Sequence, residues 1–386
     1  MARVSGDAAQ TPFNVRTNWA QFNFATNHNG LNPYENVLSP STVGNLGLRW
    51  SYPTGNRVAS SPAVANGVVY AGSLDNNVYA LNATTEAKLW QFATGNIVIS
   101  SPAVDNGAVY VGSFDNNVYA LNAATGAKLW QFTTGNSVWS SPAVANGVVY
   151  VGSFDNNVYA LLAGTGAKLW QFTTGNYVAC LPRRWSTEWS TSVHTTTMFL
   201  CPERRHRRHA VAIHHRGVRG LFPGSVERAG LGAGVQGIDI GVKRTDVGAK
   251  VWQFTTGNSI DTSPAVANGV VYVSSGDNNV YALNASTGAK LWQTAVYLGT
   301  DAAVANGVVY VGSGDYNVYA LNASTGAELW QFTTGNFVES SPVVANGVVY
   351  VGSDDNNIYA FKMTNPAEAP ARPDPATLRP NLGLGK

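Results

Sequence analysis

Short apolar runs alternate with polar turns through most of this chain. One representative copy, residues 140–176, reads SSPAVANGVVYVGSFDNNVYALLAGTGAKLWQFTTGN. Each copy carries three turn signals: Asn146-Gly147, which suits a two-residue hairpin, Asp155 to Asn157, where Asn tolerates the left-handed region, and Thr165-Gly166. Three turns between runs rich in Val, Tyr and Ala predict four antiparallel strands per copy.

This unit recurs about every forty residues, a period that indicates a repeat architecture. Its proline recurs at Pro62, Pro102, Pro142, Pro182, Pro264 and Pro342, with Ala302 standing in once. A repeated four-stranded unit of this length is typical of a β-propeller blade. A helical solenoid is disfavoured because no copy has a 3.6-residue apolar period, and a β-helix usually has shorter coils.

The two ends of the chain complement each other. The segment around Trp50 matches the last strand of a copy, whereas the copy that starts at Pro342 lacks that strand. Together they would complete one blade and close the ring without long free edges. Counting copies from the residues near 62, 102, 142, 182, 222, 264, 302 and 342 predicts an all-β, eight-bladed propeller over residues 45–363. A lead segment (1–44) precedes the propeller, and a Pro/Ala-rich tail (364–386) follows it.

The pattern disappears over residues 183–246, although the length of the interruption preserves the period. With suitable codons for residues 182–199, the third-base reading frame gives PAVVNGVVYVGSYDNNV, which is the repeat. Residues 202–217 and 221–228 decode in the second frame as LNAATGAMPSPFTTG and SSPAVSNG. We therefore predict that 183–246 is a frameshifted blade region rather than an inserted domain.

This interpretation changes how composition and charge are read. Five of the six His, together with Cys201, lie in the shifted stretch, and Cys180 stands at its edge. Its 11 basic and 5 acidic residues give net +6, so the rest of the chain carries −4 of the total of +2. We therefore expect neither a metal site nor nucleic-acid binding from this stretch. The sequence contains no predicted transmembrane span and no apolar signal-peptide core.

The string ALNASTGAKLW at residues 282–292, with siblings at 80–90, 120–130 and 320–330, resembles the tryptophan-docking motif of the pyrroloquinoline quinone (PQQ) type propeller repeats. In that family this tryptophan interlocks neighbouring blades. The resemblance implies structural docking roles for Trp50, Trp90, Trp130, Trp170, Trp252, Trp292 and Trp330. The lead, residues 18–50, also resembles the entry segment of exported family members, which implies a periplasmic or extracellular location.

The resemblance leaves several functions open, because the family includes both enzymes and scaffolds. Quinoprotein dehydrogenases of the family bind PQQ and calcium and typically carry an adjacent cysteine pair, which this chain lacks. The Asp of each Asp-Asn-Asn turn recurs in nearly every copy, so we interpret it as turn chemistry. We assign no catalytic residue and no metal ligand, and expect a monomeric, non-catalytic propeller that binds a protein or a small polar ligand. The alternatives are a quinoprotein-type dehydrogenase, with PQQ and calcium as cofactors, and a polysaccharide-binding propeller.

Where the repeats are structural, function should lie where the copies differ. Two columns differ most, both in the link between the tryptophan strand and the next Pro-containing strand. From them we predict a binding face formed by Arg57, Trp139, Tyr177, Asp261, Tyr297, Phe337 and Glu339. The residues before the Asp-Asn-Asn turns, such as Leu74, Phe114 and Phe154, should lie on the same face, because both connections run in one direction across a blade.

Overall fold

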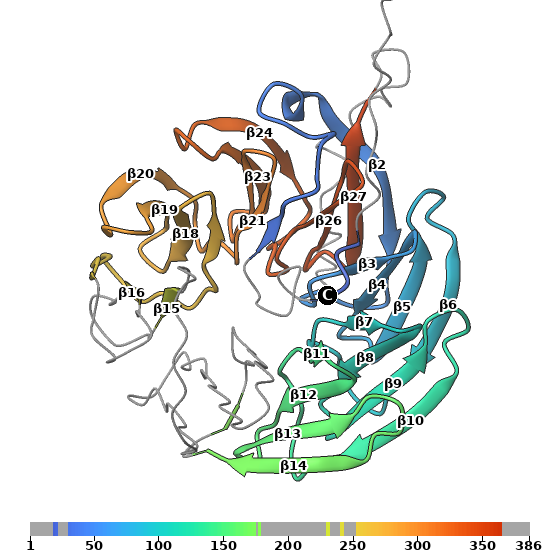
Figure 1. Ribbon diagram of the computed structural model, residues 1–386. Coiled ribbons are helices and arrows are strands. Elements are labelled where there is room, and N and C mark those ends of the chain that lie inside the picture. Colours follow the sequence, from blue (N-terminus) through green and yellow to red (C-terminus); the bar gives the residue numbers. More distant parts are fainter. Residues whose placement is uncertain are drawn as a thin grey trace, which may run out of the picture.

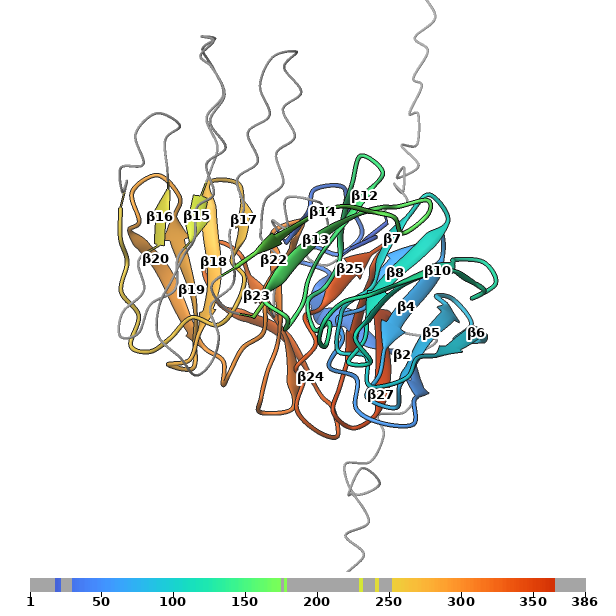
Figure 2. The ribbon, with the colours of Figure 1, turned by 90° about the horizontal axis from the view of Figure 1, so that it is seen from below.

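The computed structural model describes residues 18–21, 30–174, 177–178, 229–231, 240–242 and 252–364. Within them the chain is all-β apart from one short 3-10 helix, η1 (Val43–Asn45). Six four-stranded antiparallel blades surround a common centre (Figure 1), and from the side they stand next to one another in one layer (Figure 2). The predicted all-β propeller is therefore confirmed.

Four consecutive strands form each of five blades. They are β3 (Ala63–Ala65), β4 (Val68–Gly72), β5 (Asn77–Asn82) and β6 (Lys88–Ala93); β7 (Ala103–Asp105), β8 (Ala108–Gly112), β9 (Asn117–Asn122) and β10 (Lys128–Thr133); β11 (Ala143–Ala145), β12 (Val148–Gly152), β13 (Asn157–Leu162) and β14 (Lys168–Thr173); β17 (Ala265–Ala267), β18 (Val270–Ser275), β19 (Asn279–Asn284) and β20 (Lys290–Ala295); and β21 (Ala303–Ala305), β22 (Val308–Gly312), β23 (Asn317–Asn322) and β24 (Glu328–Thr333).

The sixth blade closes the ring with strands from both ends of the described chain. It consists of β25 (Val343–Ala345), β26 (Val348–Gly352), β27 (Asn357–Met363) and β2 (Leu46–Pro53). Strand β2 pairs antiparallel with β27, with Trp50 opposite Ala360. The predicted closure by an N-terminal strand is confirmed. We number the blades by their predicted order, so that β3–β6 is blade 1, β17–β20 is blade 6 and the closing blade is blade 8.

The turn residues take the backbone conformations that their sequence predicts. In blade 3, Asn146 and Gly147 both have positive φ (52° and 74°), as a type I′ hairpin requires, and Asn156 follows at 69°. The middle strands are buried on both faces because the blades pack face to face. One apolar cluster, for example, joins Val78 and Trp90 of blade 1 to Val109 and Leu121 of blade 2.

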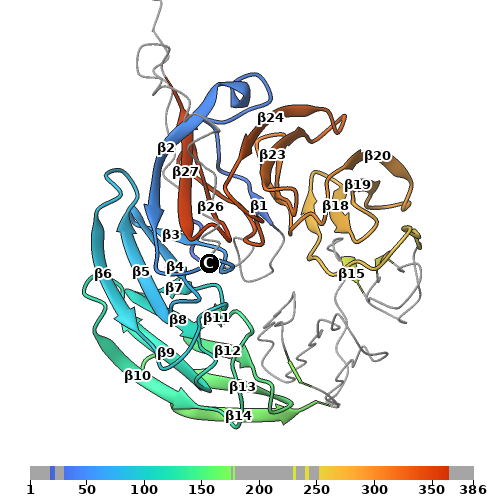
Figure 3. The same cartoon turned by 180° about the vertical axis from the view of Figure 1, so that it is seen from behind.

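The lead segment is part of the ring, which the sequence did not indicate. The backbone of Trp19 exchanges two 2.7 Å hydrogen bonds with Val64, and the Ala20 carbonyl accepts from the Val104 amide at 2.6 Å. Strand β1 (Leu31–Asn32) then pairs in parallel with β21, near the centre of the ring (Figure 3). These contacts satisfy inner-strand backbone groups that would otherwise lack partners.

The two blades predicted from residue 182 and from about residue 222 fall mainly outside the described residues. Within residues 182–251, only the short hairpin of β15 (Ala229–Leu231) and β16 (Ile240–Val242) is described. The predicted frameshift over 183–246 and the tail from 365 onward therefore also lie outside the description. None of the helices in the described part of the chain has the length and apolarity needed to cross a membrane.

Candidate functional site

The links between blades and the Asp-Asn-Asn turns lie on one side of the ring, which we call the link face. Backbone hydrogen bonds join each link to the turn of the blade that it enters. The amide of Leu74 donates to the carbonyl of Arg57 at 2.9 Å, and the same contact joins Asp354 to Phe337 at 2.8 Å. The structure thus brings the first variable column of the links together with the residues that precede the turns.

The repeated aspartates of these turns accept several hydrogen bonds within the fold. Asp115 accepts from the Tyr119 hydroxyl and the Gly95 amide, both at 2.6 Å, and from the Asn117 amide at 3.0 Å. Because Gly95 belongs to the preceding link, the Asp115 carboxylate ties two blades together, and the same contact is made by Asp75, Asp155, Asp277 and Asp355. These contacts are those expected of turn chemistry, and the exclusion of a metal role for these aspartates stays a prediction.

Four aromatic side chains from blades 2 and 3 and their links form a continuous surface, the aromatic shelf: Phe114, Trp139, Phe154 and Tyr177. The Trp139 ring centroid lies 5.5 Å from Phe114 and 5.4 Å from Phe154, and Phe154 lies 4.7 Å from Tyr177. Such tilted ring contacts are favourable. Trp139 nevertheless remains 41% exposed, so the shelf presents apolar surface to solvent, with Phe114, Phe154 and Tyr177 half-buried around it.

A second apolar group lies across the ring on the same face, which we call the blade-7 cluster: Tyr297, Leu298, Tyr316 and Phe337. All four side chains are exposed. The rings of Tyr316 and Phe337 contact each other with centroids 5.2 Å apart. A Cβ atom on Gly314 would lie 3.2 Å from both Leu298 Cβ and Tyr297 Cδ1, so these two side chains lie over the turn that leads to Tyr316.

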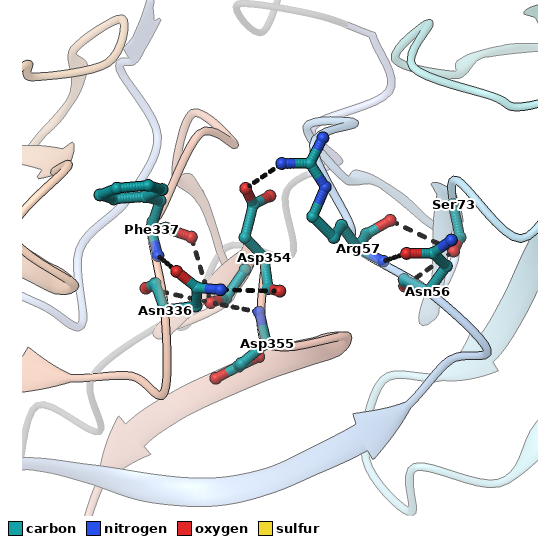
Figure 4. A network of polar contacts seen from close by, with 8 residues as sticks. Asn56, Arg57, Ser73, Asn336, Phe337, Asp354 and Asp355 are labelled. Atoms are coloured by element: carbon teal, nitrogen blue, oxygen red, sulfur yellow. Dashed lines mark hydrogen bonds and ion pairs between the residues drawn. The ribbon is translucent and has the colours of Figure 1, made fainter. Parts of the chain in front are cut away.

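Charged residues meet between blade 8 and blade 1 (Figure 4). Arg57 donates from Nη1 to Asp354 Oδ2 at 2.8 Å, while Asp354 Oδ1 is buried without a hydrogen-bond partner. Burial, and then the negative charge of Glu339, raise the pKa of Asp354 to about 6, although Arg57 opposes the shift. Sequence reasoning missed Asp354, although it interrupts a column that elsewhere reads Leu, Phe or Gly.

Asp261 lies on the link that enters blade 6, where the Ser259 hydroxyl donates to its carboxylate at 3.2 Å. It is exposed. The structure therefore distributes the predicted face into three groups: the shelf with Trp139 and Tyr177, the blade-7 cluster with Tyr297 and Phe337, and the charged group with Arg57 and Glu339. Asp261 belongs to none of the three.

A second residue that sequence reasoning missed is Asp301, on the inner wall of the ring. In the five other described blades this position is a serine. Its hydroxyl can accept from the backbone amide of the equivalent residue in the preceding blade, as Ser101 does from Ser61 at 3.0 Å and Ser61 does from Ser341 at 2.9 Å. Asp301 replaces that serine in blade 7, is buried, and accepts from the Ser263 amide at 2.5 Å. The signal was the same as for Asp354: a charge that interrupts a repeated column.

The repeated tryptophans connect neighbouring blades through their indole nitrogens. Trp90 donates to the Ala123 carbonyl at 2.9 Å, and Trp130 donates to the Ala163 carbonyl at 2.8 Å. The same kind of bond, to the following blade, is made by Trp50, Trp252, Trp292 and Trp330. Trp170, which borders the undescribed stretch, is 38% exposed. The energetic role of this docking stays a prediction.

The described residues of the link face fit PQQ only in part. The aromatic shelf offers rings on which a planar quinone could stack, but Arg57 is the only cation among the described residues of this face, and PQQ carries three carboxylates. In the described ranges, no three His, Cys, Asp or Glu side chains converge as a metal ion would require. The charges of the described residues therefore do not match the cofactor, and we derive no chemical step through it.

A sequence profile of the PQQ_2 family, described as outer membrane protein assembly factor BamB, matches residues 47–101, 74–200, 240–298 and 291–366. The chain belongs to this family. Together these matches cover most of the PQQ_2 propeller, including both strands that close the ring. Among curated proteins, no sequence matches the chain.

Solved structures share the PQQ_2 propeller fold at low sequence identity. A quinohemoprotein alcohol dehydrogenase from Comamonas testosteroni superimposes with a TM-score of 0.69 at 16% identity, over 93% of this chain and 82% of that one. The quinohemoprotein alcohol dehydrogenase ADHIIG from Pseudomonas putida HK5 gives 0.67 at 16%, over 92% and 82%. The computationally designed Ika8 protein gives 0.62 at 14%, over 80% and 97%. Because a designed protein also shares the architecture, these similarities show the fold alone.

Proposed function

We propose that this PQQ_2 protein is a ligand-binding propeller whose aromatic shelf is the contact surface for a flat, ring-bearing molecule. The observation that carries the proposal is Trp139, which stays exposed between two other rings, whereas the equivalent residues of the two preceding links are Ile99 and Ala59. A contiguous exposed aromatic surface is unusual on a protein without a partner. Aromatic faces bind planar rings and the apolar faces of sugars.

Two identities of the ligand receive support from the comparisons. The similarity to quinohemoprotein alcohol dehydrogenases supports a quinone cofactor such as PQQ, and with it an oxidoreductase function. The family description, an outer-membrane assembly factor, supports binding of a protein segment without catalysis, and an exported location. The quinone alternative is the one favoured by the named structures that share the fold. The charges of the described link face favour the non-catalytic alternative. They match neither the three carboxylates of PQQ nor a metal ion.

The decisive experiment titrates the full chain with PQQ, with and without calcium, and follows tryptophan fluorescence and quinone absorbance. A quinone-binding shelf predicts saturable binding that Trp139→Ala weakens by about tenfold or more, since stacking on one aromatic ring contributes about 1–3 kcal/mol. The matched control is Ile99→Ala, the same link position one blade earlier, which should leave affinity unchanged.

Three outcomes separate the alternatives. Calcium-dependent PQQ binding accompanied by alcohol-dependent dye reduction supports the enzyme. Binding of short β-glucan oligosaccharides or of unfolded peptides, lost in Trp139→Ala, supports the non-catalytic propeller. If Trp139→Ala and Ile99→Ala behave identically toward every ligand that binds, the shelf is not the site.

A further inference from the structure

Tyr316 interrupts the repeat at a position where a bulky side chain is disfavoured. In the five other described blades, Asn occupies this place in the turn with φ between 66° and 74°: Asn76, Asn116, Asn156, Asn278 and Asn356. Tyr316 adopts φ 76°. Asn tolerates this left-handed conformation, whereas a large aromatic residue rarely adopts it. The backbone strain at Tyr316 therefore indicates a role for its side chain.

Burial does not explain the strain. The Tyr316 side chain is 42% exposed and its ring contacts Phe337, which is 41% exposed. Leu298, in the link that enters the same blade, repeats the feature, since it has φ 46° and an exposed side chain. Two strained, exposed, apolar residues thus lie in one small part of the link face, whereas the five other described blades carry neither at these positions.

The acidic residues beside this cluster supply the second observation. Asp354, whose amide donates to Phe337, is only 4% exposed, and its Oδ1 atom makes no hydrogen bond. Glu339, two residues beyond Phe337 on the same link, adds another negative charge close enough to act on Asp354. Arg57 neutralises one of the two carboxylates, so the group has a net charge of −1. A buried carboxylate oxygen without a partner favours a nearby cation.

We propose that the blade-7 cluster together with Asp354 and Glu339 binds an organic cation, an alkylammonium group. The faces of Tyr316 and Phe337 attract a cation through their ring quadrupoles, and the surplus carboxylate charge adds a Coulombic attraction. The alkyl groups of the ligand contact Leu298 and Tyr297. This inference rests on the proposed function in one respect, namely that ligands bind on the link face. The cation site itself uses none of the four residues of the aromatic shelf.

The test titrates choline into the full chain by isothermal calorimetry at constant ionic strength. The comparison ligand is 3,3-dimethylbutan-1-ol, which has the same shape without the charge. Choline should bind at least about fivefold more tightly than the alcohol. Tyr316→Asn restores the residue of the other five turns, so it should fold at least as well as the wild type, and it should weaken choline binding by about fivefold. Asp354→Asn should weaken choline binding to a similar extent.

Trp139→Ala separates this inference from the proposed shelf. If Trp139→Ala leaves choline binding intact while Tyr316→Asn weakens it, the cation site is supported, whatever PQQ does. If choline binding depends on Trp139 and not on Tyr316, the cation belongs to the shelf and the inference is wrong. Equal affinities for choline and the neutral alcohol, or no detectable choline binding, also overturn it.

Discussion

The guanidinium of Arg57 donates to the carboxylate of Asp354 at 2.8 Å, an ion pair between residues 297 positions apart in sequence. Arg57 lies on the link that leaves blade 8, and Asp354 lies in a turn of that blade. Their contact therefore joins the two ends of the propeller on the link face (Figure 4). Asp354 is buried whereas Arg57 is exposed. Most of the desolvation free energy of this ion pair therefore falls on the carboxylate.

The pH dependence of stability should carry the signature of Asp354. Its pKa in the folded protein, about 6, lies above the ordinary 3.8 because burial and Glu339 outweigh Arg57, and Asp355 adds a smaller effect in the same direction. Its contribution to stability is thus fully present below about pH 4 and is lost as pH rises through about 6. Asp354→Asn cannot ionise, so its stability relative to wild type should increase between pH 5 and pH 8 in urea unfolding.

Two variants of the neighbours test the cause. Glu339→Gln removes a charge that raises the pKa of Asp354, so the pH dependence should become smaller. Arg57→Gln removes the charge that lowers it, so the pH dependence should become larger. Identical pH profiles for all three variants and the wild type would rule out Asp354 as the origin.

Much of this fold could be predicted because each blade repeats the same local chemistry. Asn146-Gly147 and Gly166 specify their turns through positive φ, and a missing last strand in one copy implied its partner around Trp50. The path of the lead could not be predicted. Trp19 and Ala20 bind inner strands through their backbones, and such contacts leave no residue pattern.

The candidate site was predictable as a face but not as groups of contacting residues. Variable columns located Trp139 and Phe337, yet which rings touch depends on the angle between blades, which sequence spacing does not reveal. The sequence prediction placed the residues before the turns on this face through Leu74, Phe114 and Phe154, but it gave no role to Asp354 or Tyr316. Both interrupt their turn columns, so the same comparison applied to the turns would have identified them.

Interlocking by tryptophan should depend on how completely each indole is buried. Trp130 is 8% exposed and bonds to the next blade, whereas Trp170 is 38% exposed. Trp130→Ala should lower the free energy of unfolding by about 3–5 kcal/mol, the usual range for a buried tryptophan. Trp170→Ala, the matched variant in the next blade, should cost less than half as much. Equal losses in urea unfolding would contradict the docking interpretation.

The turn aspartates should be structural and indifferent to calcium. Asp115→Ala removes acceptors for Tyr119 and Gly95, so the unfolding free energy should fall by about 2–3 kcal/mol. The control is Asp105→Ala, whose carboxylate accepts from the exposed Asn106 side chain, and it should change stability by less than about 0.5 kcal/mol. Millimolar calcium should not shift the melting temperature of the wild type or of either variant. A calcium-induced shift in the wild type that Asp115→Ala abolishes would instead indicate that Asp115 is a metal ligand.

In blade 1, Glu86 stands where other blades have glycine, and substituting it should increase the stability of the protein. Glu86 has φ 59° at a position where Gly126 and Gly166 have φ 71° and 72°. Because glycine adopts this conformation without a steric penalty, Glu86→Gly should raise the free energy of unfolding by about 1 kcal/mol. Gly126→Glu, the converse change, should be clearly destabilising, since its Cβ would lie 2.7 Å from Trp90 Cδ2. A neutral or destabilising Glu86→Gly would show that the side chain makes a compensating contact.

Restoring the hidden reading frame should stabilise the ring more than any point substitution. The decoded text for residues 182–199 supplies the Val, Tyr and Asn-Gly pattern that four-stranded blades need, whereas the present text lacks the alternation that matches a sheet face to its neighbour. A blade with the repeat pattern beside Trp170 should also bury that indole, as Trp130 is buried in blade 2. The corrected protein should therefore melt at a higher temperature, and Trp170→Ala should become about as costly as Trp130→Ala, about 3–5 kcal/mol. The control replaces residues 183–246 by a Gly/Ser segment of equal length, which should resemble the present chain. If the corrected protein melts with this control, the altered stretch does not encode a missing blade.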